Sequence, residues 1–358
     1  MPAGKAPKGA RKAAPASGSD RIGALPDETL HHVLSFLPAQ QAVRTCVLAR
    51  RWLHLWKSAT GLRIVGADGE APVPFEEVRE FVDSLLLLRG SSPLETFELR
   101  VAGDDIDVRR VRLWVRYAVQ CKVQVLRLSF LGNAHVGPVA RLRPDDPPLA
   151  SRHLTKLELR GLVFNDDFLD FSRCPELQDL HIQDCSLEHA ERISSLSLRH
   201  LNIRGAFNPS SRARILAPNL ASSVLLTFGR TPVLQKMPLL VKGTVGIRGL
   251  CEDLCSSPAP NYVSYVDFDK SCRGCIRDGS ACVILRAVSQ AEDLVLIASP
   301  DTIHLLEANV QIKGRFNPNE LPSTISSHVK EVEIICGGVD GNVLKVLRFL
   351  SKLNINLA

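Results

Sequence analysis

Five cysteines lie close together between residues 251 and 282, and thiolates at such spacings could bind a metal ion. Cys251 and Cys255 are separated by three residues, and Cys272 and Cys275 form a C-x-x-C motif. Four thiolates can hold Zn²⁺ in a tetrahedron, and both spacings suit zinc sites. Free cysteine is also a common small apolar residue, however, and no thioredoxin-like pattern surrounds the C-x-x-C. We therefore expect reduced thiols that bind no metal.

The sequence contains no residue pattern typical of a catalytic site. It lacks a G-x-S-x-G, a P-loop, an H-E-x-x-H and a dinucleotide-binding fingerprint. Its ten histidines are scattered along the chain. We therefore expect no catalytic activity and no cofactor, so that the function depends on binding surfaces.

The composition favours a folded protein behind a basic N-terminal tail. Of the 358 residues, 45% are hydrophobic and 23% charged, and the net charge is +6. Residues 1–19 contain Lys5, Lys8, Arg11 and Lys12 but no acidic residue, which predicts a disordered tail. Such a tail could bind nucleic acid, but we do not expect that partner. Because no secretory signal and no run of about 18 apolar residues is found, we expect no membrane contact and a nuclear or cytoplasmic location.

Residues 25–56, LPDETLHHVLSFLPAQQAVRTCVLARRWLHLW, are the most apolar helical stretch of the N-terminal part. A stripe at helical spacing predicts a first helix between Pro26 and Pro38, formed by Leu30, Val33, Leu34 and Leu37. Further helices fit residues 40–48 and 50–58. A unit of about 40 residues can barely make a core of its own. The surplus apolar face therefore predicts a docking surface.

The stretch DRIGALPDETLHHVLSFLPAQQAVRTCVLARRWLHLWKS closely resembles the F-box of plant F-box proteins, with Ala49 as a departure where many relatives have Ser. The resemblance implies docking on the Skp-type adaptor of a Skp–cullin–F-box ubiquitin ligase, and through it on a cullin. The residues implied for contact, or for shaping the contact surface, are Leu25, Pro26, Leu30, Leu34, Val43, Val47 and Trp52. The alternative for several of them, Trp52 above all, is a place in the core.

The rest of the chain repeats the pattern L-x-x-L-x-L. Its fourth position falls at residues 97, 126, 157, 180, 201, 223, 245, 294 and 332, and the spacing from 157 to 245 is that of leucine-rich repeats. Each copy predicts one short strand of a parallel sheet, whose alternate residues form a concave face. We expect that face to contain Glu98, Arg100, Arg127, Ser129, Glu158, Arg160, His181, Gln183, Asn202, Arg204, Val224, Leu226, Gly246, Arg248, Val295 and Ile297.

Several segments, such as CPELQDLHIQDCSL and the C-terminal VKEVEIICGGVDGNVLKVLRFLSKLNI, resemble plant F-box/leucine-rich-repeat proteins. The expected fold is α+β: an N-terminal three-helix F-box followed by an irregular leucine-rich-repeat α/β solenoid with one parallel sheet. The expected parts are a tail (1–19), an F-box (20–62), a bridging segment with a helix (63–92), a solenoid with a cysteine-containing insertion at about 250–283 (93–319) and a C-terminal capping strand-helix-strand unit (320–358).

These patterns predict the substrate-recognition subunit of a ubiquitin ligase, which holds a target protein for ubiquitination and needs no chemistry of its own. The residues expected to bind the target are Arg127, Arg160, His181, Asn202, Arg204 and Arg248. The alternative is a non-ligase repeat scaffold that binds a partner protein. Binding of the adaptor would distinguish the two.

Overall fold

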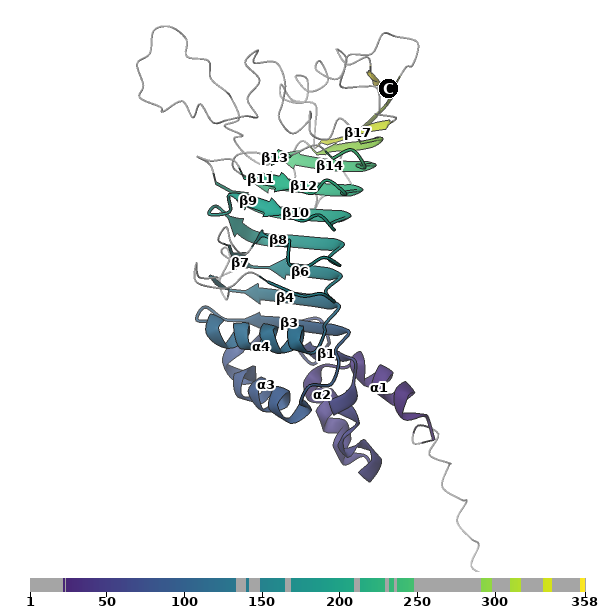
Figure 1. Cartoon of the computed structure of the whole chain (residues 1–358), viewed down its shortest axis with the longest axis vertical. Coiled ribbons are helices and arrows are strands. Elements are labelled where there is room, and N and C mark those ends of the chain that lie inside the picture. The colour runs from purple at the N-terminus through teal and green to yellow at the C-terminus, as the bar shows by residue number, and fades with distance from the viewer. Residues whose placement is uncertain are drawn as a thin grey trace, which may run out of the picture.

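The computed structural model describes the N-terminal helices and most of the repeat region. The described residues are 22, 24–132, 140–141, 149–164, 169–208, 213–228, 232–234, 237–247, 291–297, 310–316, 331–336 and 355–357. The predicted basic tail, the cysteines of 251–282, Arg248 and the helix predicted in the C-terminal unit fall outside these residues. Strands stack along the long axis of the molecule, and the N-terminal helices lie at one end (Figure 1).

The three helices predicted for the N-terminal unit are present. They are α1 (Asp27–Ser35), then α2 (Ala39–Arg44) continued by the 3₁₀ turn η1 (Thr45–Val47), and finally the 3₁₀ turns η2 (Arg50–Leu53) and η3 (Leu55–Ser58). Pro26 and Pro38 occupy the N-cap positions of α1 and α2. Proline suits these positions because the first helical turn needs no N–H donor from it.

One large sheet contains 15 of the described strands, and its order along the main path is β1-β3-β4-β6-β8-β10-β12-β14-β15-β17-β16-β18. The bounds of its strands are β1 (Gly61–Ile64), β2 (Val73–Pro74), β3 (Thr96–Ala102), β4 (Val125–Leu131), β5 (Ala140–Arg141), β6 (Lys156–Arg160), β7 (Leu162–Val163), β8 (Asp179–Leu187), β10 (His200–Phe207), β12 (Ser222–Phe228), β14 (Lys242–Ile247), β15 (Asp293–Ile297), β16 (Val310–Phe316), β17 (Glu331–Cys336) and β18 (Ile355–Leu357). The predicted α+β fold with a solenoid sheet is confirmed. The sheet already starts at β1, directly after the helices, which the repeat pattern did not indicate.

The opposite side of the core is closed by helices near the N-terminal end and by a second sheet further along (Figure 1). The helices are α3 (Phe75–Arg89) and α4 (Val108–Gln120), and the second, parallel sheet consists of β9 (Arg192–Ser194), β11 (Arg214–Leu216) and β13 (Val233–Leu234). The inward repeat residues, such as Phe97, Leu126 and Leu180, are fully buried in one continuous core. Stacked repeats therefore share their core, as such architectures require.

The strand register corrects one repeat. The predicted fourth positions of β3, β4, β6, β8, β10 and β12 are aligned across the sheet, but Ser223 of β12 pairs with Gly243 of β14 rather than with Val245. The outward residues of β14 in line with Val224 and Leu226 are therefore Thr244 and Gly246. The position in line with Leu226, which we predicted for Arg248, is occupied by Gly246. The true fourth positions of β12 and β14 are Ser223 and Gly243. Because neither is a leucine, the repeat pattern did not indicate the correct alignment of β14.

The C-terminal edge of the sheet changes direction. Strands β15 and β17 are parallel, as predicted from the repeats at 294 and 332. Strand β16, however, pairs antiparallel with both β17 and β18. Among the described strands, β16 thus lies between the first and the last strand of the predicted C-terminal unit.

A buried arginine joins the N-terminal helices to the repeats. Arg89 ends α3 and is only 4% exposed. Its guanidinium donates to the carbonyl oxygens of Ala59 (2.7 Å), Ser92 (2.6 Å) and Pro93 (2.9 Å), and to the Tyr117 hydroxyl (3.2 Å). These groups come from the end of the F-box helices, the first repeat and α4. Because a buried cation is stable only when its donors are satisfied, these contacts fix the four segments relative to one another.

Close packing between α1 and β1 also fixes the junction of the N-terminal helices with the sheet. A Cβ atom at Gly61 would lie 2.5 Å from the Ser35 carbonyl oxygen and 2.8 Å from its Cβ. The first strand can therefore approach the end of α1 only because residue 61 has no side chain.

Candidate functional site

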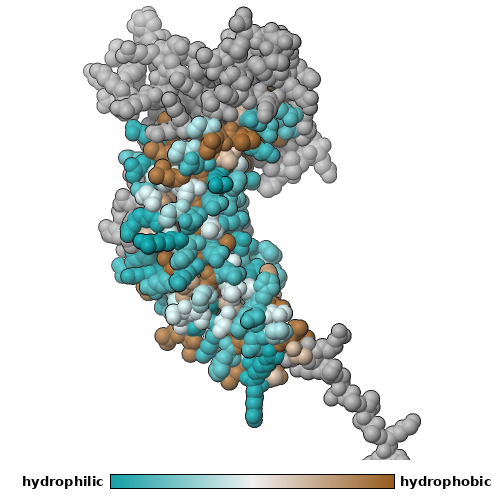
Figure 2. Space-filling view, turned by 45° about the vertical axis from the view of Figure 1, so that its right-hand side comes forward, coloured by the Kyte–Doolittle hydropathy of each residue, from teal (hydrophilic) through white to brown (hydrophobic). Residues whose placement is uncertain are grey.

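The N-terminal helices expose apolar side chains that would normally be buried. We call this set the F-box apolar surface; it comprises Ile22, Leu25, Val33, Val47, Leu48 and Leu53, with exposed fractions between 36% and 83%. Figure 2 shows hydrophobic surface near both ends of the described region, with mainly hydrophilic surface between them. Exposed apolar residues that cluster in this way mark a surface for a partner.

Sequence analysis assigned seven residues to adaptor binding, and the structure divides them into two groups. Leu25, Pro26 and Val47 are exposed, and Val43 is half-buried. Leu30, Leu34 and Trp52 are at most 7% exposed and belong to the core that continues into the sheet. These three can shape the surface from beneath, but in this structure they cannot touch a partner. The alternative of a core role therefore holds for them.

The exposed residues Ile22, Val33, Leu48 and Leu53 were not among those assigned. The helical stripe placed Val33 with Leu30 and Leu34, but its side chain is 47% exposed whereas theirs are buried. The sequence did contain one indication of such exposed residues, because it has more apolar residues than a single buried stripe requires. Which of them face outward depends on how α1 packs against β1 and η3, and the sequence does not show this.

An ion pair holds the start of α1 in place. The Arg51 guanidinium donates to the Asp27 carboxylate (Nε–Oδ1 2.9 Å) and to the carbonyl oxygen of Leu25. Asp27 is also the first residue of α1, where a negative charge interacts favourably with the helix dipole. The contact connects η2 to the N-terminal end of α1 and so positions Leu25.

The second candidate surface is the outward face of the large sheet. The register aligns its side chains in rows that cross the strands. One row contains Arg63, Glu98, Arg127, Glu158, His181, Asn202, Val224, Thr244, Val295 and Glu333, and the next contains Arg100, Ser129, Arg160, Gln183, Arg204, Leu226, Gly246, Ile297 and Ile335. Apart from the frame of β14, this is the face that the repeat pattern predicted.

The early half of this face is a network of ion pairs. Glu98, 2% exposed, accepts a hydrogen bond from Arg63 (2.8 Å), and its second oxygen lies 2.7 Å from Arg100 Nε as an ion pair without hydrogen-bond geometry. Arg127 donates to Glu158 (3.1 Å), and Arg160 donates to Asp184 (2.9 Å). The arginines of these strands are therefore largely neutralised by neighbouring carboxylates.

The same contacts shift the ionisation of two groups in the middle of the sheet. Burial by itself would raise the pKa of Glu158, but Lys156 and Arg127 outweigh it and lower the pKa below its usual value. Burial, assisted by the charge of Lys156, lowers the pKa of His181. His181 therefore favours the neutral form, in which one ring nitrogen can accept a hydrogen bond.

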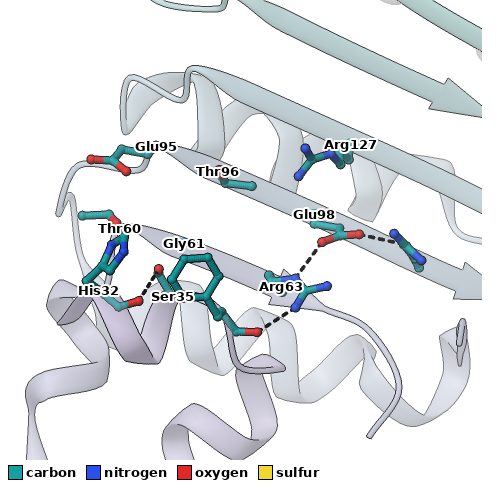
Figure 3. Close-up of a pocket in the computed structure, with 11 residues that line it drawn as sticks. His32, Ser35, Thr60, Gly61, Arg63, Glu95, Thr96, Glu98 and Arg127 are labelled. Carbon is teal, nitrogen blue, oxygen red and sulfur yellow. Dashed lines mark hydrogen bonds and ion pairs between the residues drawn. The ribbon is translucent and has the colours of Figure 1, made fainter. Parts of the chain in front are cut away.

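A pocket of about 360 Å³ lies where α1 meets the first strands (Figure 3). His32, Ser35 and Phe36 of the helical unit line one side, and residues of β1, β3 and β4 line the other. A neighbouring hollow of about 330 Å³ shares Arg100 and Arg127 with it and extends to His181. Three arginines and two glutamates line each of the two, so most of the positive charge is already balanced by carboxylates.

The six residues predicted to bind a target have different surroundings. Arg127 and Arg160 are held in ion pairs, and His181 and Asn202 are half-buried. Arg204 is exposed and, within the described part of the chain, has no ion pair or hydrogen bond to its side chain. The structure places five of them on the outward face of four neighbouring strands, β4, β6, β8 and β10, whereas Arg248 lies outside the described residues.

The described residues contain no constellation for metal chemistry. No group of three or more His, Cys, Asp or Glu residues suited to a metal occurs among them. Burial raises the pKa of the Cys185 thiol to about 12, which keeps it protonated and unreactive. Also within this part of the chain, no helix is both long and apolar enough to cross a membrane.

Comparison with known proteins identifies the N-terminal unit. Residues 22–61 match the F-box domain family. The chain is 31% identical to an F-box/LRR-repeat protein of Arabidopsis thaliana over 243 residues, which cover 56% of this chain and 39% of the relative. It is 30% identical to MEIOTIC F-BOX protein MOF of Oryza sativa subsp. japonica, covering 59% and 47%, and 28% identical to an FBD-associated F-box protein of Arabidopsis thaliana, covering 64% and 61%.

These similarities agree with the class that the fold defines. The chain carries an F-box domain followed by a repeat sheet, and its relatives include plant F-box/LRR-repeat proteins, so the resemblance inferred from the sequence is confirmed. F-box domains generally bind Skp-type adaptors, and proteins of this kind are typically non-catalytic adaptors in ubiquitination. The alignments span between 39% and 61% of the length of these relatives.

Proposed function

We propose that this chain is a substrate-recognition subunit of a Skp–cullin–F-box ubiquitin ligase. The observation that carries the proposal is the F-box apolar surface, whose six large apolar side chains, together with Phe36, are exposed on the segment that matches the F-box domain. On this proposal the Skp-type adaptor covers these side chains and links the chain to a cullin. The outward face of the sheet binds the target protein, and the complex acts in the nucleus or cytoplasm.

The junction supports this division of work. A ligase of this type works by holding a target near the ubiquitin carrier, so its two binding surfaces need a fixed separation. Arg89 and the contact of Gly61 with Ser35 provide a stiff connection between the F-box and the sheet. No catalytic group is needed in the chain itself.

A titration with a purified Skp-type adaptor tests the proposal. The Val47→Asp, Leu48→Asp double variant places two charges where the wild-type side chains are 83% and 65% exposed, so the fold should remain intact. Burying these two side chains against a partner would contribute about 3 kcal/mol, and we expect at least a hundredfold loss of affinity. Leu196→Asp is the matched control, because Leu196 is 72% exposed but lies on the solenoid.

Two results would contradict the proposal. If the wild-type chain does not bind the adaptor, the alternative of a non-ligase scaffold is favoured. If the double variant binds as tightly as the wild type, the F-box apolar surface is not the docking site.

A further inference from the structure

The outward face of the sheet changes character between β10 and β15. In β3 to β8 its rows contain mostly charged residues in ion pairs. From β12 to β15 they contain Val224, Thr244 and Val295 in one row, and Leu226, Gly246 and Ile297 in the next. We call these six residues the late-strand patch.

Gly246 leaves a gap of one side chain in the second of these rows. It lies between Leu226 and Ile297, which occupy the same row on the two flanking strands. Because neighbouring strands are about 4.8 Å apart, the backbones of Leu226 and Ile297 are separated by about 10 Å with no side chain between them. Gly246 and Leu226 are buried, whereas Val224, Val295 and Ile297 are half-buried. The three half-buried side chains are the accessible apolar part of this set.

An unpaired arginine borders the late-strand patch. Arg204 is the neighbour of Leu226 in the row, and its neighbour on the other side is the uncharged Gln183. Arg204 is exposed, whereas Arg127 and Arg160 of the earlier strands are engaged by Glu158 and Asp184. Of the described arginines that we predicted to bind a target, Arg204 is therefore the one whose whole guanidinium is available to a ligand. Such a group binds a carboxylate through two parallel hydrogen bonds.

We propose that the late-strand patch and Arg204 bind an extended segment of the target that carries an aliphatic side chain and an acidic residue about three positions apart. The spacing follows from the geometry: Arg204 and Gly246 lie two strands apart, about 10 Å, and an extended chain advances about 3.3 Å per residue. The carboxylate pairs with Arg204, and the aliphatic side chain packs over Gly246 against the accessible apolar side chains of the patch. This inference rests on the proposed function, because it names the class of target for the same sheet face.

The early half of the face suits this class of ligand less well. Arg127 and Arg160 each donate one N–H, from Nε, to Glu158 and Asp184. A target carboxylate that bound their other N–H groups would lie close to a like charge, which weakens the attraction. Arg204 has no carboxylate neighbour in its row and lies beside the late-strand patch.

A selection from a displayed library of random linear peptides tests the inference, with the full chain bound to its adaptor as the bait. We expect enrichment of peptides with Asp or Glu about three residues from Leu, Ile or Val. With Arg204→Glu the preference at the acidic position should reverse to Lys or Arg while the aliphatic preference remains. With Ile297→Asp the aliphatic preference should be lost.

Arg160→Gln is the matched control, since it removes an arginine from the same row two strands away. It should leave the selected sequences unchanged, and thermal unfolding should confirm that all variants are folded. The inference is overturned if no peptide is enriched, if the enriched peptides lack an acidic preference, or if Arg204→Glu leaves that preference intact. Adaptor affinity is measured separately through the F-box, so failure of the proposed function is distinguishable from failure of this inference.

Discussion

Replacement of Arg89 by methionine should destabilise the whole N-terminal half of the protein. The side chain is 4% exposed and donates to three carbonyl oxygens and one hydroxyl group from Ala59, Ser92, Pro93 and Tyr117. Methionine has a similar length but no donor, so the carbonyl oxygens would stay buried without partners. At about 1 to 1.5 kcal/mol for each of the four lost bonds, the free energy of unfolding should fall by about 4 to 6 kcal/mol.

The assay is thermal and denaturant unfolding followed by circular dichroism. For a chain of this size a loss of that order should lower the Tm by roughly 10 °C. Arg79→Met is the matched control, because Arg79 lies on the same helix, is 41% exposed and only pairs with Glu76. Its cost should be below about 0.5 kcal/mol.

Limited proteolysis gives a second readout of the same prediction. If Arg89 fixes the junction, the methionine variant should be cleaved between the F-box and the first repeat under conditions that leave the Arg79 variant intact. Equal unfolding curves for the two variants would refute the assignment of Arg89 as the residue that stabilises the junction.

Three further predictions concern single residues. Gly161→Ala should destabilise by at least about 2 kcal/mol, since Gly161 has φ +72° and a Cβ there would lie 1.9 Å from the Phe130 carbonyl oxygen; Gly90→Ala, with φ +69° and open space, should cost clearly less in the same denaturant titration. Because the pKa of Glu158 is lowered in the folded state, its contribution is present above its ordinary value of 4.5 and is lost as the pH falls through the folded pKa, so Glu158→Gln should flatten the acid side of a stability–pH profile, and an unchanged profile would contradict this. Elemental analysis should find no stoichiometric metal, and one zinc per chain that disappears in Cys272→Ser would reverse that expectation.

The sequence by itself determined the class of protein and most of the sheet. The L-x-x-L-x-L pattern specifies strand, spacing and face together, because side chains alternate between the two faces of a strand. The predicted positions 97, 126, 157, 180, 201 and 223 are therefore aligned in the structure. The F-box was recognisable because its dense apolar and proline pattern extends over about forty residues.

Only the tertiary structure decided which of these residues are available to a partner. Leu30 and Val33 both fit a helical stripe, but α1 packs against β1 and η3, so that one is buried and the other exposed. The arginine rows were visible in the sequence, yet their neutralisation depends on carboxylates 24 to 35 residues away along the chain. The alignment of β14 was predicted wrongly because its fourth repeat position is Gly243, and a glycine cannot be recognised as an inward apolar position. Local pattern sets the face of each strand, and contacts between strands decide which charges and apolar groups on that face remain free.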